Sequence, residues 1–220
     1  EAIKKYGMKS KWRIVPRDFG EYRGKKVFDV ERVCVATNTM SYADYLNCRR
    51  FSLITHLFAN SVFYPLIKLI KEELNISLFE FVKTVFDNLE QNNNNNEYSN
   101  TNSTNNFSKI YLEFSRECEQ ELFDSKEDIY EFYSKDENYN KLLSSELGDN
   151  LLRKYSVKII CNAFTEAINL SIDLIPKMIV KDALSKDEIR DILKSIKLWI
   201  TNLYAFDAIF NWEKEKNNET

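Results

Sequence analysis

The chain contains few of the residues from which most catalytic sites are built. Its 220 residues include one histidine, His56. A single imidazole excludes metal sites with several histidines and leaves at most one histidine base. His56 lies between Ile54 and Leu57 in a helical pattern. We therefore expect a packed or hydrogen-bonded histidine rather than a catalytic one.

Glycine is almost as scarce. The four glycines are Gly7, Gly20, Gly24 and Gly148. They are too dispersed to form a GxGxxG turn or a phosphate-binding loop, so we expect no dinucleotide or nucleoside triphosphate site. Acidic residues pair at Glu72 and Glu73 and again at Glu117 and Glu119. These pairs occupy charged helix faces, where solvation explains them, and we identify no catalytic residue.

The cysteines do not form a ligand set. They are Cys34, Cys48, Cys118 and Cys161, and no two of them form a CxxC pair. Each lies among apolar or helical neighbours, which is typical of small buried hydrophobic residues in a reducing compartment. We therefore expect no metal ligand in this chain and a cytoplasmic location.

The chain has no strong excess of charge of either sign. Its 31 basic and 34 acidic residues give a net charge of -3. This balance does not indicate nucleic acid or an anionic membrane surface as a partner. One basic cluster lies near the start, at Lys4, Lys5, Lys9, Lys11, Arg13 and Arg17. Because no aromatic platform accompanies it, we interpret it as a solvated surface or a seam with a neighbouring domain.

Long hydrophobic runs are missing as well. A membrane span needs about 18 or more consecutive apolar residues. Polar side chains interrupt the most apolar helical pattern at Lys158, Asn162, Glu166 and Asp173. We therefore expect a protein with no membrane partner, in which 44% hydrophobic residues build a core.

The pattern that is present is mainly helical, and it predicts a multi-helix bundle with a short N-terminal β or irregular segment. We expect residues 1–40 to form that segment and residues 41–220 to form a helical domain. Residues 91–106 read QNNNNNEYSNTNSTNN. Because this stretch has no large aliphatic side chain to offset the entropy of ordering, we expect a flexible loop there.

The best strand candidate is Val27–Ala36, which alternates at period two and becomes apolar on both faces near its end. No other strand is evident from the pattern, and one strand cannot form a sheet alone. We therefore expect this strand to pair outside the chain. A start at Glu1 rather than at methionine agrees with a fragment whose first 40 residues continue an upstream domain.

Capping signals mark several helix starts. Ser41 with Asp44, and Ser77 with Glu80, have the spacing of a capping box. A further box at Ser185 precedes a regular apolar stripe, which consists of Ile189, Ile192, Ile196, Trp199, Leu203, Phe206 and Phe210. The stripe favours packing inside a bundle, and a partner-binding surface is the alternative.

Arg49 and Arg50 are the candidate ligand contacts. They follow an apolar turn on a helix that the pattern predicts to be central. One guanidinium can point to solvent, whereas the other needs a carboxylate, a phosphate or backbone carbonyls. We expect a structural ion pair, with a substrate or ligand contact as the alternative.

The segment VERVCVATNTMSYADYLNCRRFSLITHLFANSVFYPLIKLI carries the one family likeness. A valine-rich strand ends in a T-x-T-M-S turn, and a helix with an acidic residue and paired arginines follows. It resembles the region after the catalytic barrel in radical S-adenosylmethionine proteins that carry an N-terminal cobalamin-binding domain. The matching residues are Val33 to Val35, Thr37, Thr39, Met40, Ser41, Asp44, Arg49, Arg50 and Phe51.

The resemblance implies a parent enzyme that performs radical methylation or a related reaction. It also implies an iron-sulfur cluster, S-adenosylmethionine and cobalamin in that parent. The family's cysteine triplet, spaced by three and then two residues, is absent here, so the chemistry would lie upstream. This chain would then be an inactive C-terminal helical domain whose partner is the catalytic domain of the same polypeptide. The alternative is a non-enzymatic helical protein-interaction module.

Overall fold

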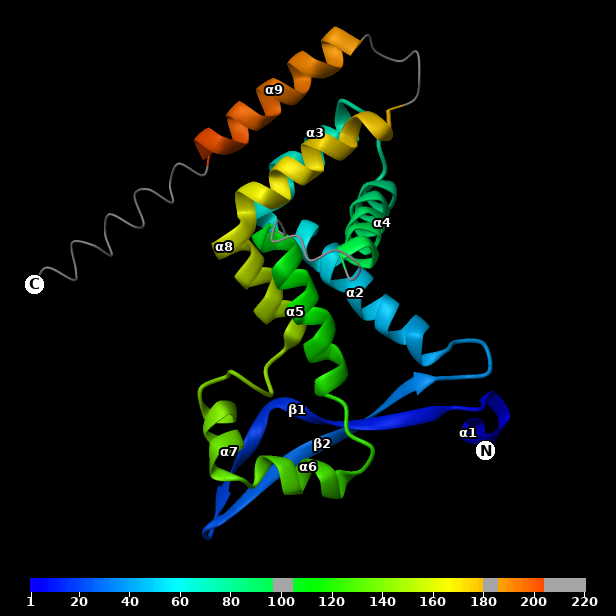
Figure 1. The fold of residues 1–220 in the computed structure, drawn as a ribbon, viewed down its shortest axis with the longest axis vertical. Coiled ribbons are helices and arrows are strands. Elements are labelled where there is room, and N and C mark those ends of the chain that lie inside the picture. The colour runs from blue at the N-terminus through cyan, green and yellow to red at the C-terminus, as the bar shows by residue number, and fades with distance from the viewer. Residues whose placement is uncertain (97–104, 180–185, 204–220) are drawn as a thin grey trace, which may run out of the picture. The chain divides into compact units, whose positions relative to one another are not determined.

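The computed structural model describes residues 1–96, 105–179 and 186–203. These residues are mainly helical, with a two-stranded antiparallel hairpin near the N-terminus (Figure 1), which confirms the predicted fold class. The elements are α1 (Ala2–Tyr6), β1 (Lys9–Tyr22), β2 (Lys25–Ala36), α2 (Tyr42–Phe58), η1 (Ser61–Phe63), α3 (Tyr64–Glu72), α4 (Leu78–Asn96), α5 (Asn106–Gln120), α6 (Lys126–Tyr133), α7 (Asp136–Leu143), α8 (Leu151–Leu174), η2 (Ile175–Lys177) and α9 (Lys186–Leu203).

The chain divides into two compact units, and each unit is made of two separate stretches. The first combines Glu1–Leu53 with Ser108–Lys158, and the second combines Ile54–Phe107 with Ile159–Thr220. The first unit therefore contains the whole hairpin together with α6 and α7. That residues 1–40 continue an upstream domain stays a prediction.

The strand predicted at Val27–Ala36 is present as β2, but the expectation that it pairs outside the chain is wrong. β2 pairs antiparallel with β1, with Trp12 opposite Arg32 and Ile14 opposite Val30. The pattern did not reveal β1, because Pro16 and Gly20 interrupt it and neither residue favours a strand. The turn at Arg23 and Gly24 has positive φ at both residues, 51° and 71°, as a tight hairpin requires.

A bulge in β1 explains how the strand accommodates its proline. Residues 15–18 of β1 lie opposite Asp29 alone, between the pairs Ile14 with Val30 and Phe19 with Phe28. Pro16 has no N–H to donate, so it is tolerated where the ladder is interrupted. Arg17 has φ 63° and its backbone N–H donates to the Gly148 carbonyl over 3.0 Å. The bulge therefore fastens the strand to the loop before α8.

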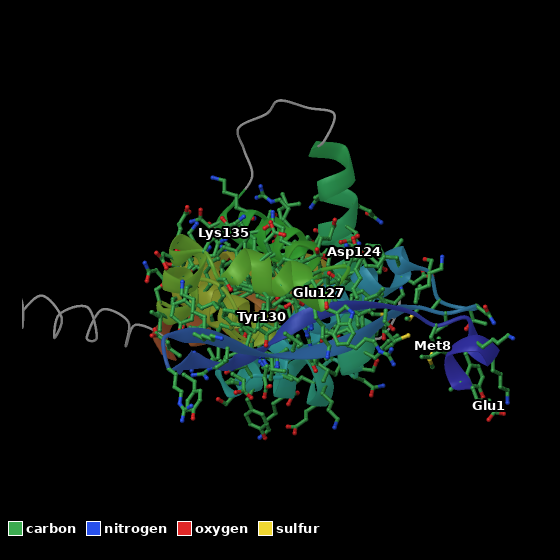
Figure 2. The ribbon with its side chains drawn as sticks, turned by 90° about the horizontal axis from the view of Figure 1, so that it is seen from below. Glu1, Met8, Asp124, Glu127, Tyr130 and Lys135 are labelled. Atoms are coloured by element: carbon green, nitrogen blue, oxygen red, sulfur yellow. The ribbon has the colours of Figure 1, made fainter. Side chains whose placement is uncertain are left out.

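The core of the first unit lies between the hairpin and the helices α6 and α7 (Figure 1). Its fully buried members are Ile14, Phe28, Ile129, Tyr133, Tyr139 and Leu142. Burying each large apolar side chain contributes about 1.5–3 kcal/mol. In Figure 2, Glu127 and Tyr130 lie beside the hairpin ribbon, and the Tyr130 hydroxyl donates to the Phe28 carbonyl over 3.1 Å. The helix is thus held by a polar contact as well as by apolar packing.

The core of the second unit contains a cluster of phenylalanine rings among aliphatic side chains. Phe58 packs edge-on against Phe63 and Phe81, with centroids 4.9 Å apart in each pair. All three rings are buried, and such pairs add about 0.5–1.5 kcal/mol beyond area burial. The Glu166 carboxylate caps the start of α5 by accepting from the Phe107 N–H over 2.8 Å.

The predicted caps are confirmed where the structure describes them. The Asp44 N–H donates to the Ser41 hydroxyl over 3.1 Å, and the Ser41 N–H donates to the Asp44 carboxylate over 2.8 Å. The bond from the Ser41 N–H, and a second one that the Ser41 hydroxyl donates to the same carboxylate, hold the pKa of Asp44 below its ordinary range. At Ser77 the hydroxyl accepts from the Glu80 N–H over 3.1 Å. Ser185 lies outside the described residues.

Two exposure predictions are wrong. His56 is exposed, because α2 turns Leu53, Ile54 and Leu57 inward at helical spacing and leaves position 56 on the other face. Of the cysteines, Cys118 is buried and Cys34 is half-buried, whereas Cys48 and Cys161 are exposed. Apolar neighbours in sequence do not bury a residue that faces away from the core.

Part of the predicted Asn-rich loop is helix. Residues 91–96 continue α4, and Asn106 already belongs to α5. Once a helix has formed, each added residue gains a backbone hydrogen bond without a new nucleation cost, and the Asn92 amide donates to Asn88 over 3.0 Å. Residues 97–104 lie outside the described part.

The helix α8 is apolar enough to pass a length and composition test for a membrane span. The stretch Leu151–Lys177 has a mean hydropathy of 1.2 over 18 residues, and 44% of that window is buried in the protein. The bent pair Tyr42–Phe58 and Ser61–Glu72, which turns by 60°, passes the same test if it is counted as one span. Core helices of proteins outside membranes pass this test too.

The last described helix, α9, contacts α3 within the second unit. Its Leu198 is 63% exposed. Most side chains of the predicted apolar stripe fall outside the described part of the chain. The choice between bundle packing and partner binding for that stripe stays a prediction.

Candidate functional site

The candidate site is centred on Glu121, which follows the end of α5. Its Oε1 accepts from Arg49 Nη2 of α2 over 2.9 Å and from Arg13 Nη1 of β1 over 3.2 Å. Arg13 Nε also donates to Glu31 of β2 over 2.6 Å. Three segments far apart in sequence thus meet at one carboxylate, and β2 joins them through Arg13, all within the first unit.

The two predicted arginines behave differently. Arg49 is half-buried and forms an ion pair with Glu121, which is the structural ion pair that the sequence predicts for one of the two arginines. Arg50 donates instead to the Asn47 side chain on its own helix. The structure therefore brings Arg49 into the site and leaves Arg50 beside it on α2. A ligand contact for either residue stays a prediction.

Burial sets the electrostatics of this cluster. Loss of hydration raises the pKa of Glu121 above its ordinary value, although Arg49 and Arg13 act in the opposite direction. Burial works to lower the pKa of Arg13, but Glu121 and Glu31 outweigh it and the pKa is raised. The Arg13 guanidinium therefore stays charged beside a carboxylate that binds protons more readily than a solvated one.

One donor in the cluster has no acceptor. Arg49 Nε is buried and lacks a hydrogen-bond partner among the described residues. The guanidinium acts on the Cys118 thiol, but burial prevails there and raises the pKa of Cys118 to about 12. A thiol with so high a pKa is a poor nucleophile. Cys118 is therefore a packing residue rather than a reactive one.

A second anchored carboxylate lies one helical turn before Glu121. Glu117 accepts from Lys154 Nζ over 2.7 Å and from the Tyr155 hydroxyl. Burial and this hydrogen bond raise the pKa of Tyr155. The sequence predicted that Glu117, like Glu119, lies on a solvated charged face of the helix. For Glu117 this is wrong, because its side chain is largely buried and paired.

A further ion pair joins Arg17 to Asp149. Arg17, re-aimed by the bulge, donates Nε and Nη2 to the two oxygens of Asp149 over 3.0 and 2.9 Å. The pair lowers the pKa of Asp149. Such a bidentate contact restricts orientation as well as adding energy, so the loop that carries Gly148 is held against β1.

These ion pairs border a cavity of about 380 Å³. Its lining combines charged groups with aromatic and aliphatic walls: Arg13, Ile14, Glu117, Gln120, Glu121, Phe123, Phe132, Tyr133, Leu147, Gly148, Asp149 and Leu151. Burial raises the pKa of Tyr133 to about 12, so its hydroxyl stays protonated and can donate or accept a hydrogen bond.

Sequence reasoning missed Arg13, Glu121 and the cavity. One signal for Glu121 was present in the sequence. Glu117 and Glu121 are four residues apart, so they lie on the same side of the helix, next to the buried Cys118. Acids on the apolar flank of a helix need partners. Arg13 gave no such signal, since it belongs to a strand that the pattern did not reveal.

The implied metal cofactor does not fit the described residues. No group of three or more His, Cys, Asp or Glu side chains within residues 1–96, 105–179 and 186–203 is arranged to hold a metal ion. An iron-sulfur cluster needs converging thiolates, whereas Cys118 is buried and Cys48 and Cys161 are exposed. The described residues therefore provide no ligand set for such a cluster.

Comparison with protein-family models finds no match, and comparison with curated proteins finds no significant relative.

Proposed function

We propose that this chain is a C-terminal helical domain of a cobalamin-dependent radical S-adenosylmethionine enzyme, and that the radical reaction is catalysed upstream of Glu1. In this proposal the chain performs no chemistry itself. It covers the catalytic barrel or shapes the access of substrate to it.

The support lies in how the family-like residues are used. Thr37 Oγ1 accepts from the N–H groups of Thr39 and Met40 over 3.2 and 3.1 Å. The Thr37 N–H donates to the Met40 carbonyl over 2.8 Å, and the Ser41–Asp44 box starts α2 directly afterwards. The side chains of Thr37 and Ser41 in the T-x-T-M-S turn therefore have definite structural roles, which supports a local fold like that of the resembled segment.

The second candidate is a helical protein-interaction module without catalysis. It is favoured by large apolar side chains that the second unit exposes, namely Phe79 at 67% and Tyr64 at 64%. Single exposed apolar residues are common on proteins, so this observation carries less weight than the turn.

The parent protein, expressed with the residues encoded before Glu1, separates the two candidates. After anaerobic purification we expect stoichiometric iron and sulfide and reductive cleavage of S-adenosylmethionine to 5′-deoxyadenosine, measured by mass spectrometry. The matched control is the 220-residue chain alone, which should show neither. A folded parent with no iron and no cleavage would refute the enzyme proposal and favour the interaction module.

A further inference from the structure

Two of the ion-paired residues that line the cavity in the first unit, Arg13 and Glu121, keep a free hydrogen-bonding atom. Arg13 donates through Nε and Nη1, and Glu121 accepts through Oε1. Arg13 Nη2 and Glu121 Oε2 have no hydrogen-bond partner among the described residues. Among these residues, Arg49 Nε is the only side-chain nitrogen or oxygen that is both buried and without a partner, so neither of the two atoms is buried. Both atoms therefore reach solvent, and both residues line the cavity.

The charges around the cavity are already balanced. Arg13 faces Glu31 and Glu121. Glu117 is paired with Lys154, and Asp149 is paired with Arg17. A charged ligand would enter without an unpaired counter-charge and would lose its hydration. A neutral ligand avoids this cost of dehydration and can still bond to Arg13 Nη2 as donor and to Glu121 Oε2 as acceptor.

Part of the cavity lining is aromatic. Phe123, Phe132 and Tyr133 form a mutual cluster with centroids 5.0–5.8 Å apart. Aromatic faces and edges favour a flat ring as their occupant. A cavity of about 380 Å³ lies at the small end of the volumes that ligand sites have, roughly 300–1,000 Å³.

We propose that this cavity binds a neutral, flat molecule of one or two rings with an amide-like edge. The ring packs against Phe123, Phe132 and Tyr133. The carbonyl oxygen of the edge accepts from Arg13 Nη2, and its N–H donates to Glu121 Oε2. This inference rests on the cavity alone and holds whether or not the parent is a radical enzyme.

Three isosteric probes test the charge preference: benzamide, benzamidine and benzoate, which are neutral, cationic and anionic at pH 7. Titration monitored by ¹⁵N chemical shifts should show saturable binding of benzamide at least tenfold tighter than binding of the two charged probes. The proposal is overturned if benzamidine or benzoate binds as tightly as benzamide or more tightly. It is also overturned if benzamide shows no saturable binding up to about 10 mM.

Two variants locate the bound probe. Glu121→Gln should weaken benzamide binding about tenfold, because it removes the charge-assisted acceptor. Its matched control is Glu119→Gln, two residues away, exposed and outside the cavity lining, which should bind benzamide as the wild type does. Phe132→Leu removes one aromatic wall without touching the ion pairs and should weaken binding about fivefold with an unchanged circular dichroism spectrum. Benzamide affinity unchanged in Phe132→Leu, or equal in the two glutamine variants, refutes the assigned site, and the phenylalanine variant decides alone if Glu121→Gln does not fold.

Discussion

Replacing Gly148, in the loop before α8, by alanine should destabilise the first unit more than the same change at either glycine of the hairpin, Gly20 or Gly24. Gly148 has φ 64°, and a Cβ there would stand 2.5 Å from Leu142 Cδ2 and 3.4 Å from Ile14 Cγ2. Leu142 is 2% exposed and belongs to the core, so its methyl group cannot move aside without disturbing its neighbours.

The magnitude follows from two contributions. A non-glycine residue in the left-handed region costs about 1–2 kcal/mol. Forcing an extra methyl group into a packed core costs about 1–3 kcal/mol more. Gly148→Ala should therefore lower the free energy of unfolding by about 2–5 kcal/mol, the sum of those two contributions.

Urea unfolding followed by Trp12 fluorescence measures this loss. Trp12 lies in β1, and its backbone pairs with Phe123 in the same unit. Trp199 and Trp212 should first be replaced by phenylalanine, so that the signal reports the first unit alone. This separation matters because a chain with two compact units need not unfold in one step.

Two glycines of the hairpin provide matched controls. Gly24→Ala adds a Cβ at φ 71° with no atom within 4 Å, so it should cost only the backbone term of about 1–2 kcal/mol. Gly20 has no positive φ and open space around it, so its alanine variant should be neutral or more stable by about 0.4–1 kcal/mol. Equal losses for Gly148→Ala and Gly24→Ala would refute the packing argument.

Three further predictions concern the site and its surroundings. The pKa of Glu121 in the folded protein lies above its ordinary value of 4.5. The wild type should therefore gain stability relative to Glu121→Gln as the pH falls through the folded pKa and down to the ordinary one. A difference in the free energy of unfolding between the two proteins that does not change with pH would contradict this. Ser125→Ala removes a capping box at the start of α6 and should cost about 0.5–2 kcal/mol in urea unfolding, and no measurable loss would show that the cap is dispensable. With a chromogenic disulfide at pH 8, Cys48 and Cys161 should react fast and Cys118 only on unfolding, since burial raises its pKa to about 12; rapid reaction of Cys118 in the folded protein would show that the thiol is accessible.

Helix starts could be predicted because their signals are local. The Ser41–Asp44 box needs only residues three apart, and its two hydrogen bonds are present. The strand β1 could not be found in the same way. Its alternation breaks at Pro16, and the bulge that accommodates this residue is fastened by the hydrogen bond from Arg17 to Gly148, a residue far away in sequence.

The ion cluster shows the same limit for the site. The pattern indicated that one of Arg49 and Arg50 needs a partner, since a guanidinium removed from solvent must be neutralised. It could not indicate that the partner is Glu121, 72 residues away, or that Arg13 shares the same oxygen. Such pairings are set by the packing of distant segments, and one sequence contains no local trace of them.

The interleaving of the two units has a consequence for synthesis on the ribosome. The hairpin, with the apolar side chains Ile14 and Phe28, is complete at Ala36, but α6 and α7 that cover it come after Ser108. At about 5–20 residues per second, synthesis of residues 37–143, from the end of the hairpin to the end of α7, takes roughly 5–20 s. During that time the hairpin face has no native cover, and chaperone binding should therefore concentrate on nascent chains that end between Ala36 and Leu143.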